Sequence, residues 1–311
     1  MSRLNGTKVL LGPSTFGVPD PAPLEQLKAA GCEIIYNPYK RKIQKNELLE
    51  LLADDVPGLI AGLEILDREV LEKTKLKVIS RCGAGMSNID LAAAERLNIK
   101  VYSTPDVPTT AVAELTLGAM LSLLRMIPQM SHDLHSGKWI KKIGLQMEGK
   151  TVVIVGFGRI GQKVAHLLKP FHVKCIVVDP YVKEKIEGVE FLPLECALPE
   201  ADIVTIHCSG EEQILGRKEF ELLKEHVFVL NASRGGVIDE QALTEFLEKG
   251  KVAGAWIDTF CQEPYDGPLT KYPNVILTPH VGSCTLETRK AMEMEAVDNL
   301  IRAFDKAGSN V

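Results

Sequence analysis

The sequence predicts an α/β protein with two doubly wound parallel sheets, one in each of two domains. Short apolar strands alternate with helical stretches over roughly the first hundred residues, and a second series of strand–helix units begins at residue 151. The 311 residues also suffice for two domains, since a typical domain has ~150 residues. Strands that alternate with helices pair in parallel, because each helix returns the chain over one face of the sheet.

The N-terminal part alternates short apolar runs with amphipathic stretches, and Gly31 ends the first of these helices. We expect strands at 9–11, 33–36, 59–61 and 77–80, and helices at 23–30, 46–52, 67–73 and 89–97. This part of the sequence contains no phosphate-binding glycine pattern.

Two prolines, Pro105 and Pro108, then interrupt the chain before a long apolar helix expected from about Thr110 to Arg125. An amphipathic helix expected at 286–304 follows the last strand–helix unit. Because the second sheet is complete by then, we expect this helix to cross back to the first domain. The predicted domains are therefore 1–103 with 286–311, and 104–285.

A dinucleotide-binding fingerprint lies between two apolar strands. Residues 151–179 read TVVIVGFGRIGQKVAHLLKPFHVKCIVVD. Gly156 permits the tight turn from strand to helix, Gly158 lets a pyrophosphate approach the backbone, and Gly161 lets the helix pack close to the strand. The N–H groups and positive dipole end of that helix then bind the pyrophosphate. A glycine-rich turn without a ligand is the alternative, and the flanking strands and terminal carboxylate argue against it.

The second strand of this unit ends in an acid, Asp179. A carboxylate at this position accepts hydrogen bonds from the ribose hydroxyls of the cofactor and repels a 2′-phosphate. No Arg follows directly, since the next residues are Pro180, Tyr181 and Val182. The sequence therefore predicts NAD rather than NADP.

Composition excludes several classes of protein. The net charge is −5 and the Lys and Arg residues are scattered, so we expect no nucleic acid and no membrane partner. No apolar run reaches the ~20 residues that span a bilayer, and the N-terminal apolar run is short for a signal peptide. The seven cysteines form no CxxC pair, which predicts a reduced cytoplasmic protein with no disulfide and no metal site.

Polar side chains follow three apolar strands of the second domain. Arg234 lies in the segment 227–239, Asp258 and Glu263 lie in 253–264, and His280 lies in 275–283, and each segment begins as an apolar strand. Carboxyl ends of parallel strands share one edge of the sheet, so we expect an active site there, in the cleft between the domains. An Arg in a surface turn and a structural His are the alternatives. Because one Arg, one His and two acids share this edge, we favour a catalytic role for them over these alternatives.

Together with shorter motifs, these residues resemble the NAD-dependent D-2-hydroxyacid dehydrogenases, near their phosphoglycerate dehydrogenase branch. The matching segments are Gly83–Asp90, Val112–Glu114, Gly137–Trp139, Val155–Gly161, Asn231–Gly235 and Thr278–His280. The resemblance covers nearly the whole chain. It implies a Rossmann NAD-binding domain, a flavodoxin-like substrate domain and a homodimer formed through the nucleotide domain.

The resemblance also implies a role for each site residue. Arg234 would hold the substrate carboxylate, and His280 would exchange a proton with the C2 oxygen while hydride moves to or from the nicotinamide. Glu263 would orient the imidazole and favour its protonated form. Substrate contacts would come from Ala84, Gly85, Arg234 and His280. Cofactor contacts would come from Gly156, Gly158, Arg159, Ile160, Gly161, Asp179, Pro180, His207, Cys208, Ser209, Ala232, Arg234, Asp258, His280 and Gly282.

The sequence also departs from this family's pattern. Phosphoglycerate enzymes carry an Arg-Ser pair where this chain reads Ala61-Gly62-Leu63-Glu64, so a substrate phosphate lacks its expected cation. Arg81, Lys141 and Lys142 are candidate substitutes, and Pro108 or Thr109 replaces a loop Asn. The turn at His207-Cys208-Ser209 replaces a His-Val-Pro-like turn.

The substrate stays open between 3-phosphoglycerate, glycerate with hydroxypyruvate, glyoxylate and another 2-hydroxy acid. Formate dehydrogenase activity is disfavoured, because those relatives carry Gln at the position of Glu263. A second hypothesis is an NAD-responsive binding protein like the C-terminal binding protein corepressors. We expect neither their partner-binding tails nor a C-terminal regulatory domain in this chain.

Overall fold

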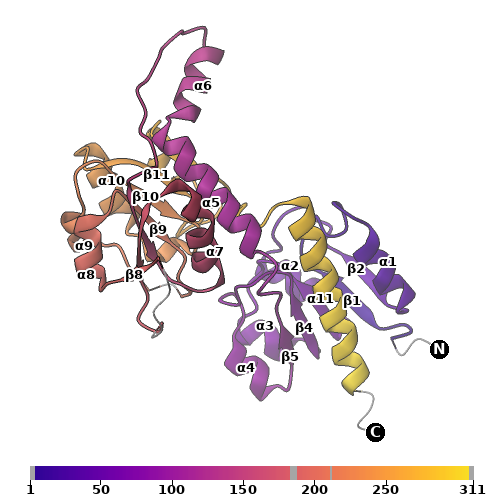
Figure 1. Cartoon of the computed structure of the whole chain (residues 1–311). Coiled ribbons are helices and arrows are strands. Elements are labelled where there is room, and N and C mark those ends of the chain that lie inside the picture. The colour runs from indigo at the N-terminus through magenta and orange to yellow at the C-terminus, as the bar shows by residue number, and fades with distance from the viewer. Residues whose placement is uncertain (1–3, 183–187, 211, 308–311) are drawn as a thin grey trace. The chain divides into compact units, whose positions relative to one another are not determined.

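The computed structural model describes residues 4–182, 188–210 and 212–307, and it contains two compact units (Figure 1). Unit 1 is Met1–Pro108 with Ser283–Val311, and unit 2 is Thr109–Gly282. The boundary between the N-terminal part of unit 1 and unit 2 lies after Pro108 and not after the expected residue 103. Thr104, the residue that follows, is still hydrogen-bonded to unit 1. The backbone N–H of Thr104 donates to the Gly83 carbonyl at 3.1 Å, and its hydroxyl accepts from the Gly83 N–H at 2.9 Å.

Unit 1 contains a parallel five-stranded sheet in the order β2-β1-β3-β4-β5. Its strands are β1 (Lys8–Leu11), β2 (Glu33–Tyr36), β3 (Gly58–Ala61), β4 (Val78–Arg81) and β5 (Lys100–Tyr102). The central strands β3 and β4 are buried along their whole length, as strands covered on both faces must be. This is the flavodoxin-like order, so the predicted fold class holds for this unit. The edge strand β5 was not expected from the sequence, because it has only three residues.

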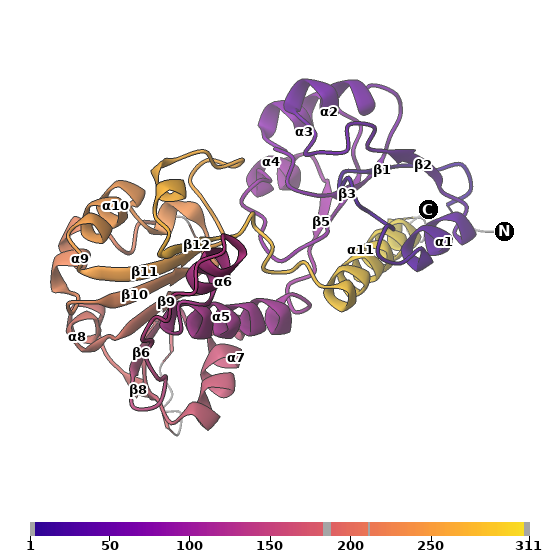
Figure 2. The ribbon, with the colours of Figure 1, turned by 90° about the horizontal axis from the view of Figure 1, so that it is seen from above.

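Helices cover both faces of this sheet. They are α1 (Ala22–Ala29), α2 (Lys45–Leu51), α3 (Arg68–Lys73), α4 (Leu91–Arg96) and α11 (Leu286–Ala307). Asp67 and Asp90 cap α3 and α4, since each side chain accepts the backbone N–H of the residue three positions on, Val70 and Ala93. The C-terminal helix α11 packs beside α1 (Figure 2) and buries Met292 and Leu300 in one core with strand residues. The C-terminal segment is therefore part of the N-terminal unit's core.

Unit 2 contains a parallel seven-stranded sheet in the order β12-β11-β10-β9-β6-β7-β8. Its strands are β6 (Thr151–Val155), β7 (Lys174–Val178), β8 (Glu190–Phe191), β9 (Ile203–Ile206), β10 (Val227–Asn231), β11 (Val252–Ile257) and β12 (Val275–Leu277). The chain order reverses between β6 and β9, as in a Rossmann sheet with one extra strand. The predicted doubly wound class therefore holds here too.

The helices of unit 2 form two layers around the sheet. They are α5 (Thr109–Leu124), α6 (Ile127–His135), α7 (Arg159–Leu168), α8 (Leu194–Ala197), α9 (Arg217–Leu222) and α10 (Glu240–Glu248). Side chains of α5 and α7 share one core, and those of α8 to α10 share the other. Helix α6 leaves the body of unit 2 after Met126, whose φ is +50° (Figure 1). Among the described residues, no single helix is long and apolar enough to cross a bilayer. Helices α5 and α6 together have that length and composition, but the pair is bent by 65°.

Candidate active site

The glycines of the fingerprint have three different surroundings. Gly156 has φ +91°, and a Cβ there would lie 2.5 Å from the Cys208 nitrogen. A Cβ at Gly161 would lie 2.1 Å from the Gly156 carbonyl oxygen. At Gly158, which caps α7, a Cβ would meet no described atom within 4 Å. Gly156 and Gly161 therefore allow the close packing of the turn. Gly158 leaves open space at the amino end of a helix, which suits a pyrophosphate.

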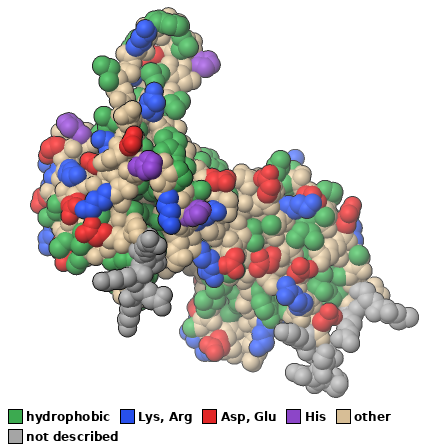
Figure 3. All heavy atoms as spheres, viewed as in Figure 1, with side chains coloured by type: hydrophobic (Ala, Val, Ile, Leu, Met, Phe, Trp, Pro, Cys, Tyr) green, Lys and Arg blue, Asp and Glu red, His purple; other side chains and the backbone are tan. Residues whose placement is uncertain are grey.

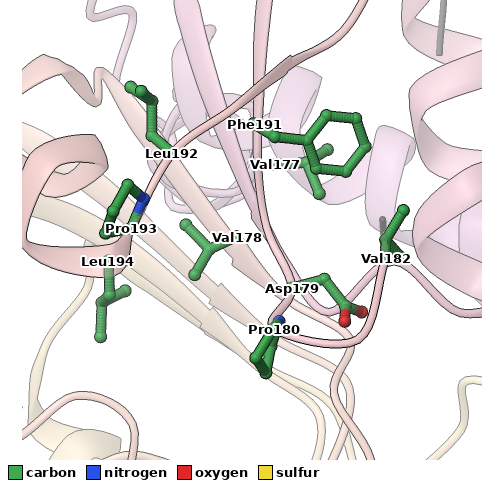
Figure 4. Close-up of a pocket in the computed structure, with 9 residues that line it drawn as sticks. All are labelled: Val177, Val178, Asp179, Pro180, Val182, Phe191, Leu192, Pro193 and Leu194. Carbon is green, nitrogen blue, oxygen red and sulfur yellow. The ribbon is translucent and has the colours of Figure 1, made fainter. Parts of the chain in front are cut away.

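Asp179 is fixed at the end of β7. Its Oδ2 accepts the Phe157 N–H at 2.7 Å, and its Oδ1 accepts the Tyr181 N–H at 2.8 Å. The same carboxylate borders a pocket of about 520 Å³ lined by side chains of β7, β8 and the start of α8 (Figure 4). A carboxylate at the rim of an apolar pocket suits an adenosine ribose and its base.

Sequence reasoning missed the far wall of this pocket. Phe191, Leu192, Pro193 and Leu194 line it. The only signal in the sequence is a short apolar run that ends in a proline. Strand β8 has two residues, which is too short for a periodic pattern.

The turn after β9 carries a buried neutral histidine. Burial lowers the pKa of His207 to about 3, so the imidazole carries no charge near neutral pH. Its Nε2 lies 2.8 Å from the Thr205 hydroxyl, and its Nδ1 has no hydrogen-bond partner among the described residues. Next to it, burial raises the pKa of the half-buried Cys208 thiol, and both Asp179 and Arg234 act on that thiol electrostatically. The turn therefore lies between the fingerprint side and the Arg234 side of the sheet edge, with Ser209 exposed beside it.

Arg234 follows β10 in a turn that Asn231 fixes. The buried Asn231 amide donates to the Arg234 carbonyl at 2.8 Å, and its oxygen accepts the Ser233 N–H at 3.0 Å. The half-buried guanidinium donates to the Ser233 carbonyl at 2.7 Å. A Cβ at Gly235 would lie 2.0 Å from the Phe260 carbonyl carbon, so the loops after β10 and β11 touch.

Asp258 anchors the turn that carries His280. Its buried carboxylate accepts the Thr278 hydroxyl at 2.5 Å and the N–H groups of Val281 and Gly282 at 2.9 Å each. These bonds hold a turn in which His280 has φ +54°, a conformation that few side chains adopt without support. The expected contact of Asp258 with the cofactor stays a prediction.

His280 and Glu263, two of the predicted catalytic residues, form a pair within hydrogen-bond distance. The Nδ1 of His280 lies 3.1 Å from Oε2 and 3.2 Å from Oε1 of Glu263, and each side chain is 34% exposed. Because Nδ1 faces the carboxylate, Nε2 is the nitrogen left for other partners. A histidine oriented by a carboxylate can give and take a proton at the opposite nitrogen.

Unit 2 contains all the predicted catalytic and cofactor residues, whereas two predicted substrate residues belong to unit 1. Ala84 is exposed and Gly85 half-buried, in the loop after β4. Within unit 2, Ile160, Ala232 and Gly282 are partly or fully buried, and Arg159 and Pro180 are exposed. Contacts of these residues with a ligand stay predictions.

A Rossmann sheet with a dinucleotide fingerprint and a histidine–carboxylate pair at its carboxyl edge is typical of NAD-dependent dehydrogenases. Residues 117–282 match the family described as D-isomer specific 2-hydroxyacid dehydrogenase, NAD binding domain. The chain belongs to this family. The resemblance seen in the sequence and the choice of NAD as cofactor are thereby confirmed.

Proteins similar to this chain are named for several different activities. A D-3-phosphoglycerate dehydrogenase of Methanocaldococcus jannaschii is 41% identical over 261 residues, which cover 80% of this chain and 50% of that protein. A hydroxypyruvate reductase of Thermotoga maritima is 34% identical over 84% of this chain and 88% of its own length. A glyoxylate reductase of Paecilomyes thermophila has a similar structure, with a TM-score of 0.85, 28% identity and coverage of 97% and 96%. The chain spans about half the length of the phosphoglycerate dehydrogenases it matches.

Proposed function

We propose that this protein is an NAD-dependent dehydrogenase that interconverts a small (R)-2-hydroxy acid and its 2-oxo acid. The paired His280 and Glu263, in the same unit as the dinucleotide fingerprint, carry the proposal. Family membership supports it, because the matched domain is named for this chemistry and this cofactor.

The proposed roles follow from the geometry of the turns. NAD supplies hydride chemistry when it is bound, and Gly158 and Asp179 offer the open helix end and the carboxylate that hold it. His280 donates a proton from Nε2 to the C2 oxygen during reduction and takes it back during oxidation, while Glu263 orients the ring. Arg234 offers guanidinium nitrogens to the substrate carboxylate. We assign substrate binding to unit 1 through Ala84 and Gly85.

The substrate is a short 2-oxo acid, for which two candidates have support. Relatives named phosphoglycerate dehydrogenase favour a phosphorylated acid. A relative that matches along most of its length is named hydroxypyruvate reductase and favours an unphosphorylated one. Two of the three candidate cations for a phosphate are engaged elsewhere. Arg81 is buried and donates to the Cys82 carbonyl, and Nζ of Lys142 lies 3.4 Å from Oδ2 of Asp133. We therefore favour the unphosphorylated acid.

We also propose a homodimer formed through unit 2. Helix α6 and the segment after it expose apolar side chains, among them Trp139 at 80% and Ile143 at 96% (Figure 3). Exposed apolar patches of this kind are typical of protein interfaces. An isologous pair of these patches would bury them both.

A cytoplasmic location without nucleic-acid or membrane partners completes the proposal. It is supported by the net charge of −5 and by seven cysteines with free thiols, as expected in a reducing compartment. A corepressor-like binding protein is the alternative function.

A turnover assay separates these functions. The protein is mixed with NADH and a panel of 2-oxo acids (glyoxylate, pyruvate, hydroxypyruvate and 3-phosphohydroxypyruvate), and NADH absorbance is followed. We expect turnover with at least one acid and its loss in His280→Ala. NADH binding without turnover of any acid would refute the enzyme proposal and support the binding protein.

A further inference from the structure

A buried carboxyl group lies at the topological switch point of the sheet in unit 1. In the order β2-β1-β3-β4-β5, the chain reverses direction across the sheet between β1 and β3. Doubly wound sheets bind ligands in the crevice beyond the carboxyl ends of the strands at this point. Glu64 follows β3 at this edge and is only 1% exposed.

Two glycines leave the room that this carboxyl group takes. Gly12 directly follows β1, and a Cβ there would lie 2.1 Å from Oε1 of Glu64. Gly62 directly follows β3, and a Cβ there would lie 2.9 Å from Oε2. Protein Cβ atoms do not approach so closely, so the carboxyl group fills the space between the two strand ends.

The turn donates hydrogen bonds as an anion site does. The Gly62 N–H donates to Oε1 of Glu64 at 2.7 Å, and the backbone N–H of Glu64 is a second donor to the same carboxyl group. Burial raises the pKa of Glu64, while these donors and the positive charges of Arg81 and Lys42 oppose the rise. Neighbouring N–H groups in a turn form a concave site for a phosphate or carboxylate. Here the chain's own carboxyl group occupies it.

The same turn is fixed to the predicted substrate loop. The Asn88 amide donates to the Glu64 carbonyl at 2.7 Å, and Leu66 forms a β-bridge with Ile89. Asn88 and Ile89 belong to the loop that contains Ala84 and Gly85. The occupied crevice is therefore next to the residues assigned to the substrate within unit 1.

We propose that Glu64 determines substrate specificity by occupying the anion site of unit 1, so that the protein accepts 2-oxo acids with a small uncharged group beyond C2 and rejects phosphorylated ones. The inference rests on the proposed function. A phosphate entering this crevice would have to displace Glu64 from its donors and leave its buried carboxyl group unpaired. Hydrogen, methyl and hydroxymethyl groups need no such displacement.

The kinetic test compares hydroxypyruvate with 3-phosphohydroxypyruvate, using NADH and the full chain. We expect the unmodified protein to prefer hydroxypyruvate in kcat/KM by at least tenfold, on the order of what one unpaired buried polar group costs. Glu64→Ala empties the crevice, and the preference should shrink by on the order of tenfold, through a lower KM for the phosphorylated acid. Glu64→Ser repeats the test if the Ala variant does not fold.

Two glutamine variants serve as matched controls. Glu64→Gln keeps the crevice filled, and its amide oxygen can accept the Gly62 N–H, so the preference should stay. Glu293→Gln alters the other fully buried glutamate described in unit 1, which accepts the Gly17 N–H at 2.8 Å. It should also leave the preference unchanged. Equal use of both acids by the unmodified protein, no shift in the Ala and Ser variants, or an equal shift in Glu64→Gln would each overturn the proposal.

Binding of inorganic phosphate tests the role of Glu64 independently of turnover. Titration calorimetry with inorganic phosphate should show binding to Glu64→Ala at millimolar concentrations and none to the unmodified protein or Glu64→Gln. A lack of turnover with every 2-oxo acid would refute the proposed function alone. In that case, phosphate binding by the unmodified protein, or none by the folded Ala variant, would overturn the role of Glu64.

Discussion

Replacing Glu263 by Gln should slow oxo-acid reduction, because the ring of His280 loses the charged partner that orients it. The two carboxylate oxygens lie 3.1 and 3.2 Å from Nδ1 of His280. A hydrogen bond to a charged group contributes about 1.5 to 3 kcal/mol, roughly twice as much as a bond between neutral groups. Since each side chain is 34% exposed, the lower end of this range applies, about 1.5 kcal/mol. A change of 1.36 kcal/mol in the barrier corresponds to about tenfold in rate.

The direction follows from how the ring is held. In Glu263→Gln the amide can turn its oxygen or its NH2 group toward Nδ1, so the imidazole is oriented less firmly. The proton at Nε2 is then less well aligned with the C2 oxygen, and kcat should fall by about tenfold for reduction and for oxidation. The KM for NADH should change little, because Glu263 contacts the histidine and not the fingerprint. Glu263→Ala removes the partner of the ring and should lower kcat further.

The assay measures kcat and KM in both directions at saturating NADH or NAD. Glu240→Gln is a matched control, because Glu240 accepts the N–H of Cys261, which lies in the same loop as Glu263, at 3.0 Å. It should leave kcat unchanged. An unchanged kcat in both Glu263 variants would show that Glu263 does not act on His280, and the assignment of the pair would have to be abandoned.

Three further expectations concern cofactor choice, the catalytic side chains and assembly. NAD should exceed NADP clearly in kcat/KM, and Asp179→Ala should narrow the gap; equal use of both cofactors by the unmodified protein would contradict the role of Asp179. Arg234→Ala should raise KM and lower kcat, whereas His280→Ala should lower kcat by roughly 10²–10⁴ with NADH binding nearly kept, as checked by fluorescence titration. Light scattering should give twice the single-chain mass of 34.1 kDa, and Trp139→Ser with Ile143→Ser should weaken the dimer; a monomer of the unmodified protein at micromolar concentration would rule it out.

The sequence by itself determined the elements and the chemistry that local patterns encode. An apolar run after a glycine predicted β2 at its observed bounds, 33–36. The three glycines after β6 predicted a turn whose geometry needs two of them. Polar residues directly after strands predicted the edge where Arg234 and His280 lie, because parallel strands all point their carboxyl ends the same way.

Only the tertiary structure decided which polar groups face one another. In the sequence, the turn Ala61-Gly62-Leu63-Glu64 showed only that an Arg-Ser pair is missing. Glu64 is buried because Gly12, about fifty residues earlier, leaves room for it at the neighbouring strand. Asp258 likewise follows a strand, and only the fold shows that its carboxylate holds Val281 and Gly282. These contacts join segments distant in sequence. The order of the strands, the packing of the loops and burial determine these contacts, and no local periodicity of the sequence encodes those three properties.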